Sequence, residues 1–180
     1  MKKYVLVLAL LAVPAMAFGQ TASMSLVVGG SSEITTDGLD SGVLLELVID
    51  SADTAIAGYD VWLTASQSGV LSLSGESKSV ITDFAYGSAN GTLDPGSGTT
   101  SSLNMSGDTP TTTWPATIIS WTLTSIDDLD LPVTIDIGTN LSAAGGVAFE
   151  VSKTSLEIVP EPATMLLLAG ALPFLRRRRA

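Results

Sequence analysis

The sequence predicts an all-β fold, a single β-sandwich of nine short strands. Three observations lead to this prediction. Apolar residues alternate with serine and threonine along most of the chain, which is the period-two pattern of strands with one buried face. Glycine, asparagine and aspartate recur between these runs, where tight turns favour them. Between the two terminal segments, no run of ten or more residues has the 3.6-residue period of an amphipathic helix.

The nine strands are expected in chain order, and each is marked by apolar residues two positions apart. The second strand is apolar on both faces, whereas the third has Trp62 on the face opposite to its apolar residues. The markers are Met24, Leu26 and Val28; Val43, Leu45, Leu47 and Ile49; Tyr59, Val61 and Leu63; Leu71 and Leu73; Phe84 and Tyr86, in a strand from about Val80; Ile119, Trp121 and Leu123; Val133, Ile135 and Ile137; Val147, Phe149 and Val151; and Leu156 with Ile158.

The segment 90–110 interrupts this pattern. It is rich in glycine, serine and threonine and nearly free of large apolar residues. Such a segment buries too little apolar area to offset the entropy lost on ordering. We therefore expect a mobile surface loop there.

The N-terminal segment has the features of a secretory signal peptide. Lys2 and Lys3 give a positive start, residues 5–13 are apolar, and Ala15 and Ala17 form a small-x-small cleavage site. We therefore assign 1–17 to a signal peptide cleaved by signal peptidase. The alternative, an uncleaved membrane helix, has an apolar run well short of the roughly 20 residues that spanning requires.

The C-terminal segment 160–180 has the features of a temporary membrane anchor. Pro160, Glu161 and Pro162 precede a run of 13 apolar residues, 163–175, and the chain then has Arg176, Arg177, Arg178 and Arg179. As a helix the run reaches about 20 Å, against a bilayer core of about 30 Å, and the arginine side chains extend its reach. The arginine block should stay cytoplasmic. The two prolines should keep the preceding segment irregular and open to a protease.

This tail resembles the PEP-CTERM sorting signal in residues 159–165 (VPEPATM), Leu166 to Leu168, Gly170 and the arginine block. The resemblance covers about an eighth of the chain. It implies export in a Gram-negative-type bacterium and processing near the Pro-Glu-Pro motif by an exosortase, a membrane transpeptidase. Many such bacteria make exopolysaccharide or floc matrix. The alternative is an ordinary C-terminal membrane anchor that is not processed.

The body, residues 18–159, is strongly acidic and suits one domain. Six of the eight basic residues and one of the 18 acidic residues lie in the terminal segments, so its net charge is near 2 − 17 = −15. This charge repels nucleic acid and anionic lipid and attracts cations. Acidity that serves solubility alone is the alternative.

The chain contains neither cysteine nor histidine. The body therefore has no disulfide and cannot form a Ser-His-Asp or Cys-His catalytic arrangement. Zinc, copper and haem lose their usual ligands. We expect no catalytic residues.

The body also resembles a cohesin-type domain, more loosely and over about 110 residues. Residues 43–50 (VLLELVID) followed by 56–63 (IAGYDVWL) look like the opening of such a domain, and 116–123 (ATIISWTL) with 131–135 (LPVTI) are similar to its penultimate hairpin. The resemblance implies a nine-stranded jelly-roll sandwich related to carbohydrate-binding modules. Cohesins bind dockerins, but no dockerin-contacting pattern can be matched in this sequence.

The candidate metal ligands are Asp127, Asp128 and Asp130, in the turn between the sixth and seventh strands, with Asp50 and Asp53 flanking an earlier turn. Clustered carboxylates can bind Ca²⁺, although the spacing is not that of an EF-hand and turn aspartates often bond nearby backbone amides instead. A pair of carboxylates could also serve a glycosidase, but 17 acids supply such a pair by chance.

Among the three tryptophans, Trp121 is expected in the core, because it alternates with Ile119 and Leu123, whereas Trp62 and Trp114 are candidates for an exposed binding surface. Three functions follow. The first is an exported, non-catalytic protein of the cell envelope or extracellular matrix, anchored and processed through its tail. The second is a module that binds a carbohydrate such as exopolysaccharide, or an envelope protein, with or without Ca²⁺. The third is a small hydrolase.

Overall fold

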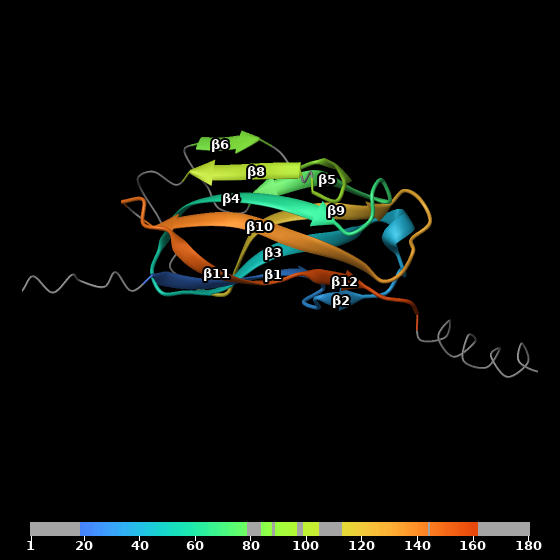
Figure 1. Ribbon diagram of the computed structural model, residues 1–180, viewed down its shortest axis with the longest axis horizontal. Helices are drawn as coiled ribbons and strands as arrows, with labels where there is room; N and C mark the ends of the chain where they lie inside the picture. Colours follow the sequence, from blue (N-terminus) through green and yellow to red (C-terminus); the bar gives the residue numbers. More distant parts are fainter. Residues whose placement is uncertain are drawn as a thin grey trace, which may run out of the picture.

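Two six-stranded sheets pack face to face in the computed structural model, which describes residues 19–78, 84–87, 89–96, 99–104, 113–143 and 145–161 (Figure 1). Sheet A has the order β11-β1-β3-β9-β5-β7, and sheet B has the order β2-β12-β10-β4-β8-β6. The strands are β1 (Gln20–Val28), β2 (Glu33–Ile34), β3 (Val43–Ala52), β4 (Ile56–Ala65), β5 (Leu71–Lys78), β6 (Phe84–Gly87), β7 (Gly91–Leu93), β8 (Thr99–Asn104), β9 (Ala116–Ser125), β10 (Val133–Ala143), β11 (Phe149–Thr154) and β12 (Leu156–Ile158).

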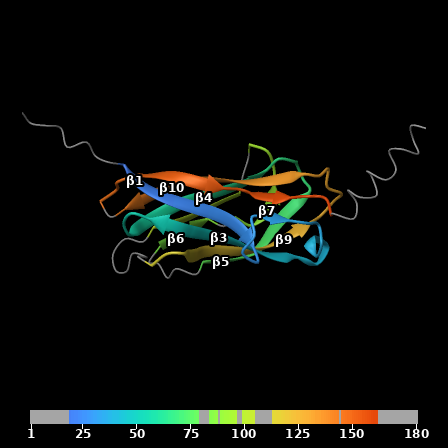
Figure 2. The same ribbon diagram turned by 90° about the horizontal axis from the view of Figure 1, so that it is seen from below.

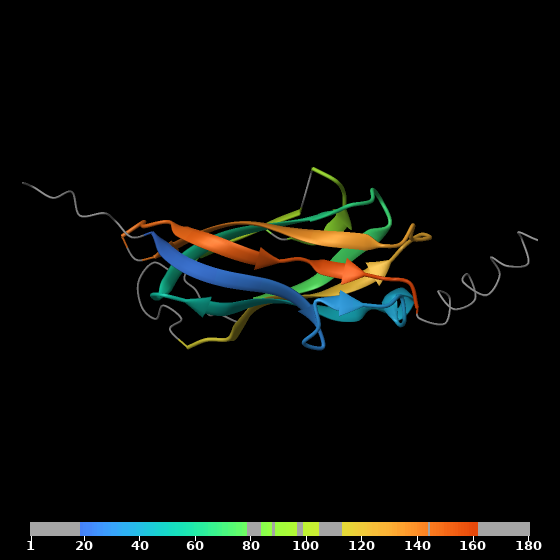
Figure 3. The ribbon, with the colours of Figure 1, turned by 60° about the horizontal axis from the view of Figure 1, so that its bottom comes forward.

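The two layers are seen nearly edge-on in Figure 2. Most neighbouring strands are antiparallel, but β1 pairs in parallel with β11, and β2 pairs in parallel with β12. Figure 3 shows β11 and β12 running beside β1 and β2, so the first and last strands of the body close the same side of the sandwich. The chain enters β1 at one end of the long axis and leaves β12 at the opposite end (Figure 1).

The core lies between the sheets and contains most of the alternating residues that the sequence pattern marks. Val147, expected in the eighth strand, is an exception, because it precedes β11 and is exposed. In sheet A, the side chains of Leu45 and Leu47 are fully buried, and in sheet B those of Val61 and Leu63 are fully buried. Trp121 is the largest of the fully buried side chains, as expected. Burial of each such side chain stabilises the fold by roughly 1.5–3 kcal/mol relative to exposure. The intervening residues of these strands face outward and are mostly serine, threonine and acidic residues.

The all-β prediction is confirmed, but the number of strands is wrong: the described residues form twelve rather than nine. The two-residue strand β2 is too short to show an alternation. The loop expected at 90–110 is also wrong in part, because this segment contains β7 and β8. Their partners explain the error: β7 hydrogen-bonds to β5, and β8 pairs with six consecutive residues of β4. Backbone hydrogen bonds to an existing strand can order a segment with few apolar side chains.

Several predicted features lie outside the described residues: the signal peptide with Ala15 and Ala17, Pro162, the apolar run 163–175 and the arginine block 176–179. They stay predictions. Within the described part of the chain, no helix is long and apolar enough to cross a membrane. The helical structure there is a three-residue 3-10 helix, η1 (Leu39–Ser41).

Candidate functional site

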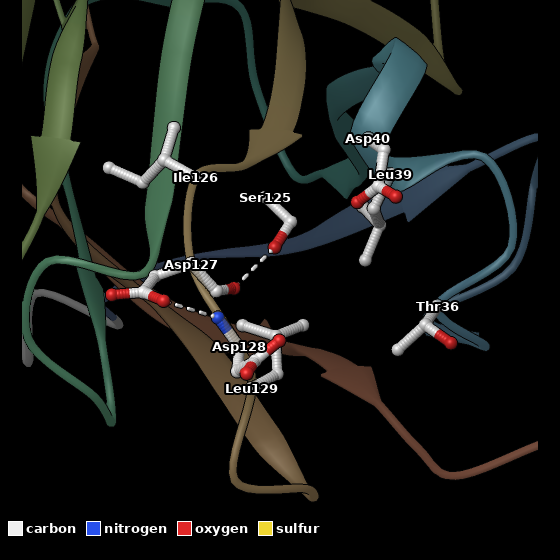
Figure 4. Close-up of a pocket in the computed structure, with 8 residues that line it drawn as sticks. All are labelled: Thr36, Leu39, Asp40, Ser125, Ile126, Asp127, Asp128 and Leu129. Carbon is white, nitrogen blue, oxygen red and sulfur yellow. Dashed lines mark hydrogen bonds between the residues drawn. The ribbon is translucent and has the colours of Figure 1, made fainter.

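A cleft of about 410 Å³ lies at the end of the sandwich where the chain leaves β12. Figure 4 shows residues 125–129, from the end of β9 and the β9–β10 connection, on one side and Thr36, Leu39 and Asp40 on the other. The side with Leu39 and Asp40 is formed by η1. This helix starts at Gly38, which adopts a left-handed conformation (φ 79°) that glycine allows. Leu39 is buried and anchors this helix, while Asp40 is exposed.

Two of the three predicted calcium ligands, Asp127 and Asp128, line this cleft, and both are exposed. The Asp127 carboxylate accepts a hydrogen bond from the Asp128 amide (2.9 Å), as turn aspartates commonly do. Asp130 is not among the lining residues; its amide donates to Gln67 Oε1 (3.1 Å), and its carbonyl accepts from Gln67 Nε2. Within the described residues, no three acidic side chains are grouped to hold a metal ion.

The structure thus separates Asp130 from Asp127 and Asp128. Calcium binding stays a prediction of the sequence, and a thermal melt tests it, since a ligand of the native state must raise the midpoint over that in EDTA.

The earlier turn aspartates have structural roles. Asp53 follows β3, and its carboxylate accepts hydrogen bonds from the amide (2.8 Å) and the hydroxyl (2.7 Å) of Thr21. These bonds lower the pKa of Asp53 below its ordinary value. Asp50 accepts from the Ser25 hydroxyl (2.9 Å) across the same strand pair. Both residues therefore hold β1 against β3.

The described part of the Pro-Glu-Pro motif lies directly after β12. The Val159 amide donates to the Ile34 carbonyl (2.8 Å), and the Glu161 carboxylate accepts from the hydroxyl of Thr36, which lines the cleft (3.4 Å). Pro160 and Glu161 are half-buried. Pro160 and Glu161 belong to no helix or strand, and Glu161 contacts the body through Thr36.

A second candidate lies on the outer face of sheet B, around Trp62. In β4, Val61 and Leu63 face the core, so Trp62 faces outward and is half-buried. It is paired in register with Gly138 of β10. A Cβ atom at position 138 would lie 1.8 Å from Trp62 Nε1 and 1.9 Å from Cε2. The indole therefore lies across β10 in the space that any other side chain at position 138 would fill.

Polar side chains flank the indole along both strands. Asp60 and Asn140 are paired on one side of it, and Thr64 and Asp136 are paired on the other. Residues two apart on one face of a strand are separated by about 6.6 Å, so these groups are immediate neighbours of the ring. Asp60, Asp136 and Asn140 are exposed. We refer to Trp62, Gly138 and these four flanking residues as the Trp62 platform.

Further acidic side chains lie on the outer face of sheet B, on the side of β12 and β2. Glu157 of β12 and Glu33 of β2 are paired in register, and both are exposed. No strand of this sheet contains lysine or arginine. The two lysines of the body are in sheet A, at Lys78 and Lys153.

A buried ionic group between the sheets was not expected from the sequence. The side chains of Glu76 and Lys78 are only 6% and 15% exposed and form an ion pair (3.0 Å). Glu76 Oε2 also accepts hydrogen bonds from Trp121 Nε1 (3.3 Å) and the Ala89 amide (2.5 Å). A register shift after Ser74, with Gly75 at φ 63°, turns Glu76 inward against the alternation set by Leu71 and Leu73.

Tyr59 faces this interior from β4 and is 3% exposed. Its hydroxyl has no hydrogen-bond partner in the described part of the chain. Burial, with a smaller effect of the Glu76 carboxylate, raises the pKa of Tyr59 well above its ordinary value. Trp114 is half-buried and packs against the core cluster, so of the three tryptophans Trp62 is the one on an outer sheet face.

No protein-family model matches the chain. No curated protein matches it either. Solved structures, however, share its fold. A cohesin module from a Clostridium perfringens family 33 glycoside hydrolase superposes with a TM-score of 0.58 at 12% identity, covering 79% of this chain and 98% of that one.

Two further neighbours are cohesins with partners or surface roles in their names. The sixth cohesin of Acetivibrio cellulolyticus scaffoldin B, solved with a Cel5 dockerin, has a TM-score of 0.53 at 12% identity and covers 79% of this chain and 99% of that one. A type III cohesin from a cell-surface anchoring scaffoldin of Ruminococcus flavefaciens has a TM-score of 0.52 at 10% identity and covers 79% and 88%. The body therefore has the cohesin β-sandwich fold.

Proposed function

We propose that the chain is an exported, non-catalytic protein of the cell envelope or extracellular matrix, and that its cohesin-like body is a binding module. The cohesin fold is the observation that carries this proposal, because it accounts for nearly all of the chain between the terminal segments. Binding modules need open, rigid surfaces, and the outer faces of the two sheets supply them. The partner is an envelope protein or a carbohydrate such as exopolysaccharide.

The terminal segments supply the route. Signal peptidase removes residues 1–17 after Ala17, and the apolar run 163–175 then holds the protein in the membrane with the arginine block 176–179 in the cytoplasm. An exosortase processes the tail near Pro160, Glu161 and Pro162. The position of Glu161, three residues after β12 and bonded to Thr36, supports this order, because a segment that leaves a folded body is accessible to a protease.

The geometry supports surface display. The cleft and Glu161 lie at one end of the long axis, and β1 begins at the other (Figure 1). An anchor that continues from Glu161 therefore leaves the long sides of the sandwich, and both outer sheet faces, open to the surroundings. The host is expected to be a Gram-negative-type bacterium.

Replacement of Pro160, Glu161 and Pro162 by alanine tests the processing step. In a host with an exosortase, the variant should stay membrane-bound and full length at its C-terminus, while the parent is trimmed. Trp62→Ala is the matched control, because it changes the body and should be trimmed like the parent. Trimming and release of the triple-alanine variant would refute the processing proposal.

Capture experiments test the binding role. The full chain, immobilised in mild detergent, should retain a protein or a polysaccharide from the envelope of its own host. Retention of nothing beyond what an unrelated immobilised membrane protein retains would count against a binding module.

A further inference from the structure

The Trp62 platform combines an outward-facing indole with a carboxylate on either side of it. We infer that this platform binds a polysaccharide with free amino groups: one pyranose ring stacks on the Trp62 indole, and its ammonium groups contact the carboxylates of Asp60 and Asp136. The inference rests on the proposed binding function and adds a ligand class and a site.

The first reason is the way the indole is held. A glycine inside a strand destabilises it by about 0.5–1 kcal/mol relative to alanine and often marks the close approach of another group. At Gly138 the approaching group is the indole, whose Nε1, Cε2 and Cζ2 atoms lie 1.8, 1.9 and 2.5 Å from the position that a Cβ atom would occupy. The indole therefore packs directly on the backbone at Gly138, and this contact keeps the ring flat against the sheet. The result is a flat aromatic surface that is already in place before any ligand arrives.

The second reason is that the indole does not belong to the core. Trp62 is absent from the buried cluster and from the apolar residues that pack against it, whereas Trp114 and Trp121 belong to those groups. Its outward neighbours in register are aspartate, asparagine, threonine and glycine. An outward-facing tryptophan among polar groups offers a flat apolar surface of the kind that a sugar ring requires. The C–H bonds of a pyranose pack on the ring, while its hydroxyl and amino groups bond to the polar neighbours.

The third reason separates a sugar from a protein partner. Protein interfaces have an apolar centre that is depleted of charged residues. The large exposed apolar side chains of the described residues are Leu44, Ile126 and Val147, and none of them belongs to a strand of sheet B. The platform instead has one aromatic ring with a carboxylate on either side.

The fourth reason is charge. Asp60, Asp136, Glu157 and Glu33 face outward from strands that contain no lysine or arginine. This face repels an acidic polysaccharide and attracts ammonium groups. A cation above an aromatic face is further stabilised by the ring quadrupole. Stacking and charge therefore favour the same ligand, an amino sugar.

Binding of a chitosan hexamer to the full chain in mild detergent tests the inference. Isothermal titration calorimetry should detect binding of this amino-sugar probe. The fully N-acetylated hexamer, which keeps the rings but lacks the charge, should bind about tenfold more weakly or not at all, and polygalacturonate should not bind. Equal binding of the charged and acetylated hexamers would overturn the role of the carboxylates.

Variants locate the site. Trp62→Ala should weaken chitosan binding by about tenfold or more, which is the size expected for loss of a partly desolvated stacking contact. Asp60→Asn with Asp136→Asn should weaken it similarly and reduce its salt dependence. Asp50→Asn is the control, because Asp50 is an exposed aspartate on sheet A. Binding that is unchanged in Trp62→Ala would refute the site.

Gly138→Ala keeps every functional group of the platform and changes only the backbone position on which the Trp62 indole packs. The new Cβ must push the ring off the sheet, which a tryptophan side chain at the surface can accommodate by rotating. We expect a red-shifted Trp62 emission, a nearly unchanged melting midpoint and several-fold weaker chitosan binding. Unchanged chitosan binding together with a shifted emission would show that binding does not depend on the position of the indole over Gly138.

Two outcomes separate this inference from the proposed function. If polylysine binds as tightly as chitosan and also depends on Trp62, the ligand is a basic protein, and the inference is wrong while the binding module stands. If no probe binds but the envelope capture succeeds, the inference again fails alone. Failure of the capture experiment contradicts the proposed function itself.

Discussion

Tyr59→Phe should stabilise this protein, although it removes a polar group from the centre of the fold. The Tyr59 side chain is 3% exposed, and its hydroxyl finds no partner in the described part of the chain. A buried, unsatisfied hydroxyl costs about 1–3 kcal/mol of desolvation. Its removal leaves a small void that offsets part of this gain. We expect a net stabilisation of about 1 kcal/mol, which raises the melting midpoint by about 2–4 °C for a domain of this size.

The same substitution has a pH signature. The pKa of Tyr59 is raised above its ordinary value of 10.0 by burial, so the tyrosine of the unfolded chain ionises first as the pH rises. The folded state then binds more protons than the unfolded state, and stability falls with increasing pH above about 10, by up to roughly 1.4 kcal/mol per pH unit. Below that pH this group contributes no slope. Tyr59→Phe lacks the effect, so its advantage over the parent should grow above about pH 10.

Urea unfolding followed by far-ultraviolet circular dichroism, at about pH 7 and at intervals from about pH 9.5 to 11, measures both effects. All other titrating groups are shared by the two proteins, so the difference between their free energies of unfolding isolates Tyr59. A Tyr59→Phe variant that is less stable than the parent at neutral pH, or whose advantage is the same at neutral and at alkaline pH, would refute the reasoning.

Two other predictions concern ionic groups. Glu76→Gln removes the ion pair with Lys78 and weakens the acceptor for Trp121 Nε1 and the Ala89 amide, so it should destabilise the fold by about 1–3 kcal/mol in urea unfolding. The exposed control Glu157→Gln should change stability by less than about 0.5 kcal/mol; equal effects would contradict the role of the ion pair. Asp53 has a lowered pKa, so its contribution to stability is present above its ordinary pKa of 3.8 and is lost as the pH falls below that value. Asp53→Asn should therefore be less sensitive to acid than the parent between about pH 5 and pH 2, and identical acid profiles would argue against the bonds to Thr21.

The strands that face a hydrophobic core could be predicted from the sequence, because burial of one face imposes alternation. This holds for β3, β4, β9 and β10, and it also places Trp121 inside and Trp62 outside. The strands β7 and β8 could not be predicted, because they are specified by backbone pairing to β5 and β4 and only Leu93 is a fully buried marker in β7. The inward turn of Glu76 follows from a bulge at Gly75, which alternation cannot show.

The candidate sites divide in the same way. The sequence clusters Asp127, Asp128 and Asp130 by their proximity in the chain, but folding bonds Asp130 to Gln67 and leaves the other two at the cleft. The Trp62 platform joins residues from β4 and β10 that are far apart in sequence. One signal was present: Gly138 stands alone in an otherwise regular strand, and such a glycine marks a close approach. That the approaching group is Trp62 follows only from the pairing of β10 with β4, which the sequence does not reveal.

The central claim is that the chain is an exported binding module from which both terminal signals are removed. The most direct test expresses the full-length gene in a host with an exosortase. It combines intact mass spectrometry of the product with protease treatment of whole cells. The account predicts a chain that begins after Ala17, ends close to Glu161 and is accessible from outside the cell. An unprocessed chain of 180 residues that is protected inside the cytoplasm would contradict it.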